Sequence, residues 1–166
     1  MNLKNLTKQC LFWCRFLFLF VSIVVSIFII VKVRPIEIIG CSMSPALKTG
    51  DRCVLYITQN VKRHDIICLR SPSGGTDLVK RVIGLPGEKV FVCPSGIIIN
   101  DKNILHEKYL LGTLRKNQAT KIIQLKKDEI FVLGDNRINS RDSMMFGPVK
   151  ISSVQGVIKA VLFNTP

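Results

Sequence analysis

The sequence predicts an all-β domain of antiparallel sheets joined to one N-terminal transmembrane helix. Two observations lead to this fold class. A long uncharged apolar run lies near the N-terminus, and short runs rich in β-branched residues, separated by Gly, Pro, Ser and polar residues, fill most of the remaining 166-residue chain. We expect three parts: an N-terminal cytoplasmic tail (residues 1–10), a transmembrane anchor (11–33) and an extracytoplasmic β-rich domain (34–166).

The apolar run FLFLFVSIVVSIFIIV, residues 16–31, holds sixteen residues without a charge. Flanking apolar residues extend it to 11–33, and Arg15 and Lys32 can place their charges among lipid headgroups. This span meets the ~20 residues that a helix needs to cross a lipid bilayer. The alternative is a cleavable secretory signal peptide, but its apolar core would be unusually long and no A-x-A-like site follows it. We therefore expect an uncleaved membrane anchor.

Basic residues on the two sides of this span indicate its orientation. Lys4, Lys8 and Arg15 lie on the N-terminal side, whereas Lys32 and Arg34 follow the run. The positive-inside bias slightly favours a cytoplasmic N-terminus. We expect a single-pass protein of the plasma (inner) membrane, with an organellar inner or thylakoid membrane as the alternative.

The charge and the cysteines of the remaining chain limit its partners. Of 24 basic and 11 acidic residues, five basic and one acidic precede Gly40, which leaves 19 basic and 10 acidic residues and a net charge of +9. This balance suits an anionic membrane surface. No nucleic-acid partner is expected, because no helix-turn-helix, zinc-finger or aromatic-platform pattern is present.

The cysteines give no indication of a metal site, because no CxxC pair or Cys/His spacing is present. Whether Cys41, Cys53, Cys68 and Cys93 form disulfides, and in which pairs, stays open.

Strands are expected wherever β-branched residues gather between turn signals. The expected ranges are 52–57, 65–70, 77–85, 89–93, 97–100, 121–125, 130–133 and 154–163. Residues 94–96 (Pro-Ser-Gly) indicate a hairpin, and a second turn is expected at 126–129. The stretch 106–120 has the least pattern and is expected to be a surface loop.

The first motif, GCSMSPALKTGD, spans residues 40–51. Gly40 lets the chain bend with little steric hindrance, and Pro45 ends any extended run. Ser42 would thus be presented at a bend, where main-chain amides can form an oxyanion hole. A plain polar turn is the alternative, because Ser, Gly and Pro form turns in most proteins.

The second motif, DLVKRVIGLPGE, spans residues 77–88 and places a lysine on an apolar strand. Strand alternation puts Lys80 on one face with Leu78 and Val82. A lysine whose stem covers apolar surface while its charge reaches water is the alternative explanation. If Lys80 is instead buried, its ammonium form is disfavoured, and the neutral amine can remove a proton from a serine such as Ser42.

The third motif, GDNRINSRDS, spans residues 134–143 and is dense in side chains that form hydrogen bonds. We expect Asp135, Asn136 and Asp142 to brace main-chain amides, and Ser140 to orient Lys80. A solvated polar loop is the alternative.

In this order, the three motifs resemble those of bacterial type I signal peptidases, membrane-anchored serine proteases that remove signal peptides from exported preproteins. The matching residues are SM-x-P, KRV-x-G and GDN-R-x-NS-x-D-S, and the resemblance covers the anchor and nearly the whole domain. It implies that Ser42 is the nucleophile, that Lys80 is the general base and that Ser140 supports Lys80. It also implies preprotein substrates and no metal or organic cofactor.

Two positions depart from the family pattern. Some members carry a serine where this chain has Gly40, so only main-chain donors are available there. The third motif normally continues with an arginine, where this chain has Met144. If that arginine pairs with Asp142, another cation is expected in its place, such as Arg81 or Arg141.

Three other functions remain open from the sequence. Self-cleaving repressors of the DNA-damage response share the first two motifs, but they are soluble, and the apolar span argues against them. A catalytically degenerate, membrane-anchored accessory or substrate-binding subunit is a second alternative, although Ser42 and Lys80 are both present. The third is a dedicated peptidase of a conjugation or secretion system. The protein export machinery is an expected partner, and Arg137 favours a bacterial or plastid home.

Overall fold

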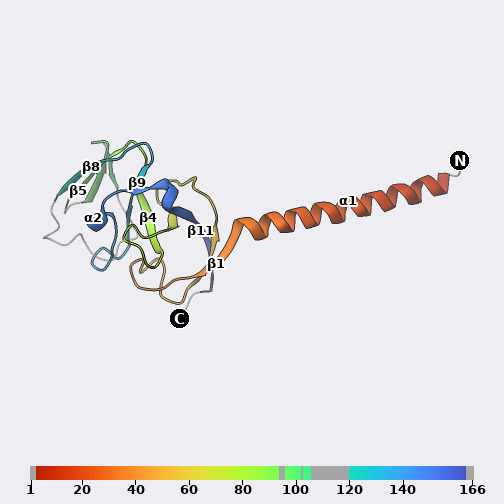
Figure 1. The fold of residues 1–166 in the computed structure, drawn as a ribbon, viewed down its shortest axis with the longest axis horizontal. Helices are drawn as coiled ribbons and strands as arrows, with labels where there is room; N and C mark the ends of the chain where they lie inside the picture. The colour runs from red at the N-terminus through yellow and green to blue at the C-terminus, as the bar shows by residue number, and fades with distance from the viewer. Residues whose placement is uncertain (1–2, 94–95, 102, 106–119, 164–166) are drawn as a thin grey trace. The chain divides into compact units, whose positions relative to one another are not determined.

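The computed structural model describes residues 3–93, 96–101, 103–105 and 120–163. Contacts between residues divide the chain into two units, Met1–Arg34 and Pro35–Pro166. The first unit consists mainly of helix α1 (Leu3–Lys32), and the second holds almost all of the β-structure (Figure 1).

Helix α1 has the length and composition of a membrane span. Its segment Leu11–Lys32 has a mean hydropathy of 2.8, and none of the side chains described in it is buried within the protein. An apolar helix of this length that no protein surface covers is suited to a bilayer. The helix ends at Lys32, shortly before Pro35, because proline lacks the N–H that would continue the helical hydrogen bonding.

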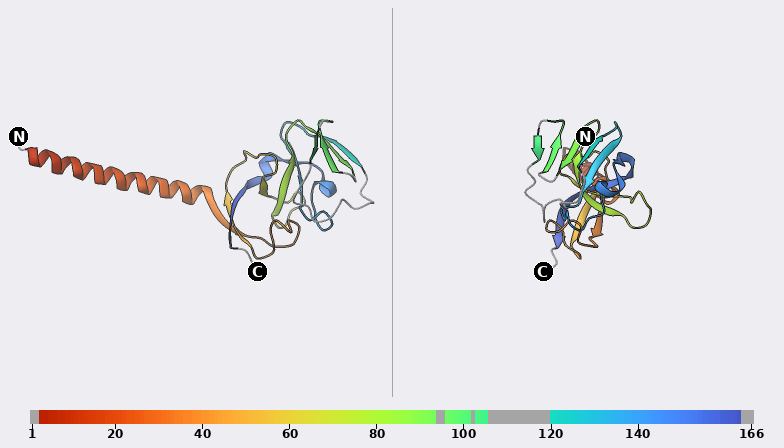
Figure 2. Two further views of the ribbon diagram at one scale, coloured as in Figure 1. Left: turned by 180° about the vertical axis from the view of Figure 1, so that it is seen from behind. Right: turned by 90° about the vertical axis from the view of Figure 1, so that its left-hand side faces the viewer.

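The second unit is built from two β-sheets (Figures 1 and 2). The larger sheet has the strand order β1-β2-β11-β3-β4-β9-β10, and the smaller has the order β7-β6-β5-β8. Every pairing whose register is described is antiparallel, which confirms the predicted fold class. The strands of the larger sheet are β1 (Val33–Glu37), β2 (Arg52–Tyr56), β3 (Ile66–Leu69), β4 (Leu78–Gly84), β9 (Glu129–Leu133), β10 (Val149–Lys150) and β11 (Val154–Phe163). Those of the smaller sheet are β5 (Lys89–Cys93), β6 (Gly96–Ile99), β7 (Asn103–Leu105) and β8 (Lys121–Gln124).

The eight expected strands are present with small shifts at their ends, and the hairpin of β5 and β6 is confirmed by the pairing of Cys93 with Gly96. The turn at 126–129 is also present, since Glu129 N–H donates to the Lys126 carbonyl at 3.2 Å. The strands that flank this turn belong to different sheets, however, because β8 pairs with β5 and β9 pairs with β4. The expected loop 106–120 lies almost wholly outside the described residues.

Strand β4 is buried on both of its faces, and this placement explains why its lysine is buried. Val82 belongs to an apolar cluster with residues of β3, β9 and β11, whereas Ile83 belongs to a second cluster with residues of β5, β6 and β9. A third cluster contains Ile38, Met43, Leu47 and Cys53. It anchors the segment that carries Ser42 to the larger sheet.

Short elements that the sequence analysis did not predict complete the fold: β1, β7, β10, helix α2 (Ser143–Phe146) and the 3-10 turn Ile151–Ser153.

Candidate active site

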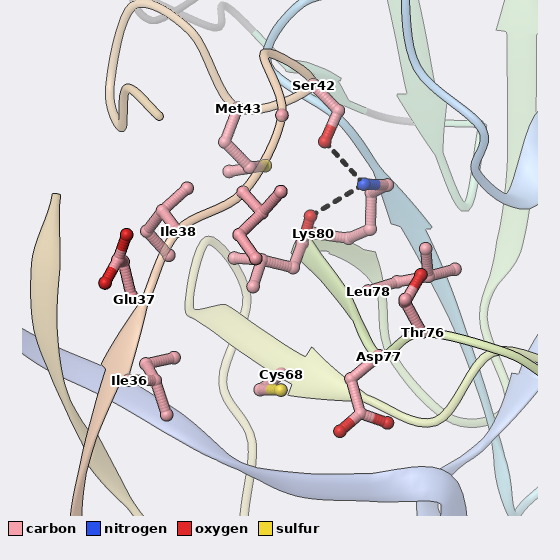
Figure 3. Close-up of a pocket in the computed structure, with 13 residues that line it drawn as sticks. Ile36, Glu37, Ile38, Ser42, Met43, Cys68, Thr76, Asp77, Leu78 and Lys80 are labelled. Atoms are coloured by element: carbon pink, nitrogen blue, oxygen red, sulfur yellow. Dashed lines mark hydrogen bonds between the residues drawn. The ribbon is translucent and has the colours of Figure 1, made fainter. Parts of the chain in front are cut away.

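The structure brings Ser42 and Lys80 into direct contact. Lys80 Nζ donates to Ser42 Oγ at 2.7 Å and to the Val79 carbonyl at 2.8 Å (Figure 3). The lysine is only 2 % exposed, although it lies beside a pocket. The sequence allowed the alternative that the charge of Lys80 extends into water, and the burial of the residue excludes that alternative.

Burial lowers the pKa of Lys80 from 10.5 to about 8. Loss of hydration disfavours the ammonium form, and the negative charges of Asp142 and Asp135 oppose this effect only in part. Near pH 8 about half of the molecules therefore hold a neutral amine next to the serine hydroxyl. A neutral amine at hydrogen-bond distance can accept the proton of that hydroxyl.

The bend that presents Ser42 is fixed on both sides. Gly40 has φ +92°, a conformation that glycine adopts at lower cost than residues with a side chain, so the glycine favours this bend. After the serine, Met43 and Leu47 are 1 % and 2 % exposed in the core. The Leu47 N–H also donates to the Met43 carbonyl at 2.9 Å. The hydroxyl is thus held by buried neighbours while Ser42 itself stays partly accessible.

The segment 134–143 holds this bend through its main chain. Asn136 N–H donates to the Ser42 carbonyl at 3.0 Å, and Asn136 Nδ2 donates to the Cys41 carbonyl at 3.2 Å. Gly134 approaches so closely that a Cβ added there would lie 2.5 Å from the Ser42 carbonyl oxygen. These bonds of Asn136 go to main-chain carbonyls, whereas the expected contact with a main-chain amide is the 3.2 Å bond from Asn139 N–H to Asn136 Oδ1. Gly134 is a positioning residue that the sequence analysis missed.

Arg81 and Asp135 form a buried ion pair beside the lysine. Arg81 Nε donates to Asp135 Oδ1 at 2.8 Å, and a second guanidinium nitrogen donates to Oδ2 at 2.5 Å. Arg81 also donates to the His64 carbonyl at 2.9 Å. Two parallel bonds of this kind fix both side chains in one orientation. The pair connects β4 to the segment that follows β9.

Asp142 accepts two hydrogen bonds from main-chain groups, Gly134 N–H at 3.0 Å and Met144 N–H at 3.1 Å. The second bond caps helix α2. Arg141, one of the cations suggested as its partner, instead donates to Ser73 Oγ.

Met144 occupies the position where the family pattern has an arginine, and it is buried in the cluster between the two sheets. Its carbonyl accepts a hydrogen bond from Lys121 Nζ on β8. At this position an apolar side chain packed in the core thus replaces the arginine of the family pattern. The only cation described in contact with Met144 is Lys121, and it binds the main-chain carbonyl.

The structure places Ser140 beside Gly134 in the same segment. Its Oγ is buried and has no hydrogen-bond partner among the described residues, and the hydrogen bonds described for Lys80 go to Ser42 and Val79. The hydroxyl lies next to Gly134, where an added Cβ would be 2.2 Å from it. Ser140 is therefore in the site, but its support of Lys80 stays a prediction.

A pocket of about 360 Å³ opens beside Ser42 and Lys80. Its walls are residues 36–40, Ser42, Met43, residues 76–80 and Cys68 (Figure 3). Along one edge Leu78–Lys80 pair with β3, whereas the described pairs of β4 with β9 begin only at Arg81. The main chain at the start of β4 can therefore accept an added strand on its other edge. Sequence patterns did not indicate Cys68 as part of this wall. The structure describes five free thiols, those of Cys14, Cys41, Cys53, Cys68 and Cys93.

A serine hydroxyl 2.7 Å from a buried lysine of lowered pKa, next to an open strand edge, has the chemistry that a serine hydrolase acting on peptides would need. The family model for signal peptidases (signal peptidase, peptidase S26) matches residues 10–163. The chain belongs to this family, and it is accordingly a serine peptidase.

Several curated relatives are similar to the chain over most of its length. Signal peptidase I T of Bacillus subtilis is 32% identical over 96% of this chain and 89% of its own. Signal peptidase I V of the same organism is 30% identical over 85% and 95%, and signal peptidase IB of Staphylococcus aureus is 32% identical over 81% of both chains. A solved signal peptidase I from Enterococcus faecalis is 35% identical and covers 60% of this chain and 97% of its own, with a TM-score of 0.45.

Proposed function

We propose that this protein is a serine endopeptidase that removes N-terminal signal peptides from exported preproteins, with Ser42 as nucleophile and Lys80 as general base. The single observation that carries the proposal is the 2.7 Å hydrogen bond between Lys80 Nζ and Ser42 Oγ, made by a lysine that is 2 % exposed. The family assignment supports the same reaction.

The substrate would bind as an extended strand between residues 36–39 and the open edge at Leu78–Lys80. Side chains of a strand alternate in direction, so the first and third residues before the scissile bond would enter the pocket together. The wall contains apolar residues such as Ile36, Ile38 and Leu78, and its limited volume favours small side chains.

In the acylation step, Ser42 Oγ attacks the carbonyl carbon of the scissile bond while neutral Lys80 takes its proton. Negative charge on the former carbonyl oxygen would be stabilised by main-chain N–H groups at the Ser42 bend. When the tetrahedral intermediate collapses, the Lys80 ammonium gives its proton to the leaving amine, and the mature protein departs. Lys80 then takes a proton from water as the water attacks the acyl-enzyme, and it returns this proton to Ser42 Oγ when the ester bond breaks, which releases the cleaved signal peptide and restores the neutral amine.

The supporting residues would hold this geometry rather than react. Asn136 fixes the Ser42 main chain, Asp142 holds Gly134, and the pair of Arg81 with Asp135 fixes the start of the same segment. None of these roles needs a metal or an organic cofactor.

Helix α1 would anchor the protein in the plasma (inner) membrane, with residues 1–10 cytoplasmic, 11–33 in the bilayer and 34–166 on the outer side. The length and hydropathy of Leu11–Lys32 support the anchor. This topology would put Ser42 on the side where preproteins emerge, next to the protein export machinery as a partner.

Processing of a preprotein by the full-length protein in membranes tests the proposal. Ser42→Ala should abolish processing while the protein stays in the membrane fraction. Lys80→Arg should also fail, because a guanidinium stays protonated at any pH of the assay. Full processing by Ser42→Ala would contradict the proposal and would favour an accessory subunit instead.

A further inference from the structure

Most carboxylates of this protein are already engaged. The structure describes ten of its eleven acidic residues, and no hydrogen bond or ion pair of the side chain is described for Glu37, Asp77 and Asp128. The other seven accept hydrogen bonds or form ion pairs: Asp51, Asp65, Glu88, Asp101, Glu129, Asp135 and Asp142. Two of the three unpaired carboxylates, Glu37 and Asp77, line the pocket beside Ser42.

Glu37 and Asp77 lie at the rim of that pocket from two directions. Glu37 belongs to β1, and Asp77 directly precedes β4, so the two residues come from the two walls (Figure 3). Both are exposed, whereas Lys80, the one cation among the described residues that line the pocket, is buried against Ser42. The rim is thus anionic in a chain whose net charge is +13.

The negative charge of Asp77 acts on Cys68, which lines the same pocket. The pKa of the Cys68 thiol is raised to about 11, first by burial and then by the negative charge of Asp77. Cys68 itself lines the pocket, so a substrate group in the same space experiences the same field.

We propose that Glu37 and Asp77 make the enzyme prefer substrates with a lysine or arginine at the second or fourth residue before the scissile bond. The inference rests on the proposed function, because it needs an extended substrate between the two walls. In such a strand, side chains at the first and third positions enter the pocket, and those at the second and fourth turn toward the rim. The long stems of lysine and arginine can follow the apolar wall and bring their charges to the carboxylates.

The size of the preference follows from the exposure of the two carboxylates. Ion pairs between exposed groups change affinity by a factor of about two to five. The effect of each carboxylate should decrease as salt is added, because charges at the surface are screened over about 8 Å at physiological ionic strength.

The test uses the full-length protein in detergent and peptides that differ only in one residue. Lysine, glutamine or glutamate is placed at the second or at the fourth position before the scissile bond, and kcat/KM is measured for each peptide. At one of these positions lysine should exceed glutamine by about two- to fivefold, with glutamate lowest. Glu37→Gln and Asp77→Asn should each reduce the preference. Asp128→Asn, which removes an unpaired exposed carboxylate away from the pocket, should leave it unchanged.

Equal rates for the three peptides at both positions, or a preference that persists in the double variant of Glu37 and Asp77, would overturn the inference. Binding of the same peptides to Ser42→Ala gives the charge preference independently of turnover. If wild-type protein cleaves none of the peptides, the proposed function fails, and the binding series alone then decides whether the rim selects cations.

Discussion

The pH dependence of peptide cleavage should report the titration of Lys80. The proposed mechanism needs a neutral amine, so the protonated enzyme is inactive and activity rises with pH. Because burial lowers the pKa of Lys80 to about 8, this rise should fall within the range where the protein can be assayed.

The shifted pKa sets the size of the effect. With a pKa of about 8, the neutral fraction of Lys80 is about 9% at pH 7, about half at pH 8 and about nine-tenths at pH 9. The value of kcat/KM should therefore rise about tenfold from pH 7 to pH 9 and then level off. With the ordinary pKa of 10.5, the rise over the same interval would be about a hundredfold and would not level off.

The assay is cleavage of a peptide without titratable groups by full-length protein in detergent, between pH 6.5 and 9.5. The Asp142→Asn variant provides a second reading, because the charge of Asp142 raises the pKa of Lys80. Its removal should move the midpoint to lower pH, whatever happens to the maximum rate. A profile that is flat, or that rises about a hundredfold without a plateau, would refute the role given to burial.

Three further predictions concern the framework of the site. Gly134→Ala should lower kcat by about a hundredfold with little change in fold. The added Cβ would displace the Ser42 carbonyl, and a displacement of about 1 Å in an active site lowers the rate by about this factor. Steady-state kinetics and circular dichroism check the two parts of this prediction. Lys80→Met should be inactive but more stable than wild type at pH 7. The pKa of Lys80 is lower in the folded than in the unfolded protein, so the free energy of unfolding of the wild type increases as pH rises from about 8 to about 10.5. Over this range the difference in free energy of unfolding between Lys80→Met and wild type should shrink by about 3 kcal/mol, as measured by denaturant titrations. Asp135→Asn should lower the free energy of unfolding by about 3–5 kcal/mol, because it leaves the Arg81 charge buried without its carboxylate; an unchanged unfolding midpoint would contradict this.

The sequence predicted the contact of Ser42 with Lys80, the proposed reacting pair, because the signals at both residues are local. A lysine between apolar residues of a strand indicates burial, and a serine between glycine and proline indicates a bend. The contact of Ser42 with Lys80 was an inference from the chemistry that serine needs, and the hydrogen bond between them agrees with it.

Other features depend on contacts that no local pattern records. The turn at 126–129 has the same residues whether its strands pair with each other or enter different sheets, so the division into two sheets could not be predicted. The place of Met144 in the core and the approach of Gly134 to Ser42 likewise follow from the packing of the segment after β9. The anionic rim joins residues that lie forty positions apart in the chain, Glu37 and Asp77.

The most direct test of the central claim is the identification of the acylated residue. Full-length protein is treated with a serine-reactive acylating probe at pH 8, digested and analysed by mass spectrometry. The mechanism predicts one adduct, on Ser42, which is absent from Lys80→Met because no base activates the hydroxyl. An adduct on Cys41 or Ser140 in protein that cleaves its substrate, or equal labelling of Ser42 in Lys80→Met, would contradict it.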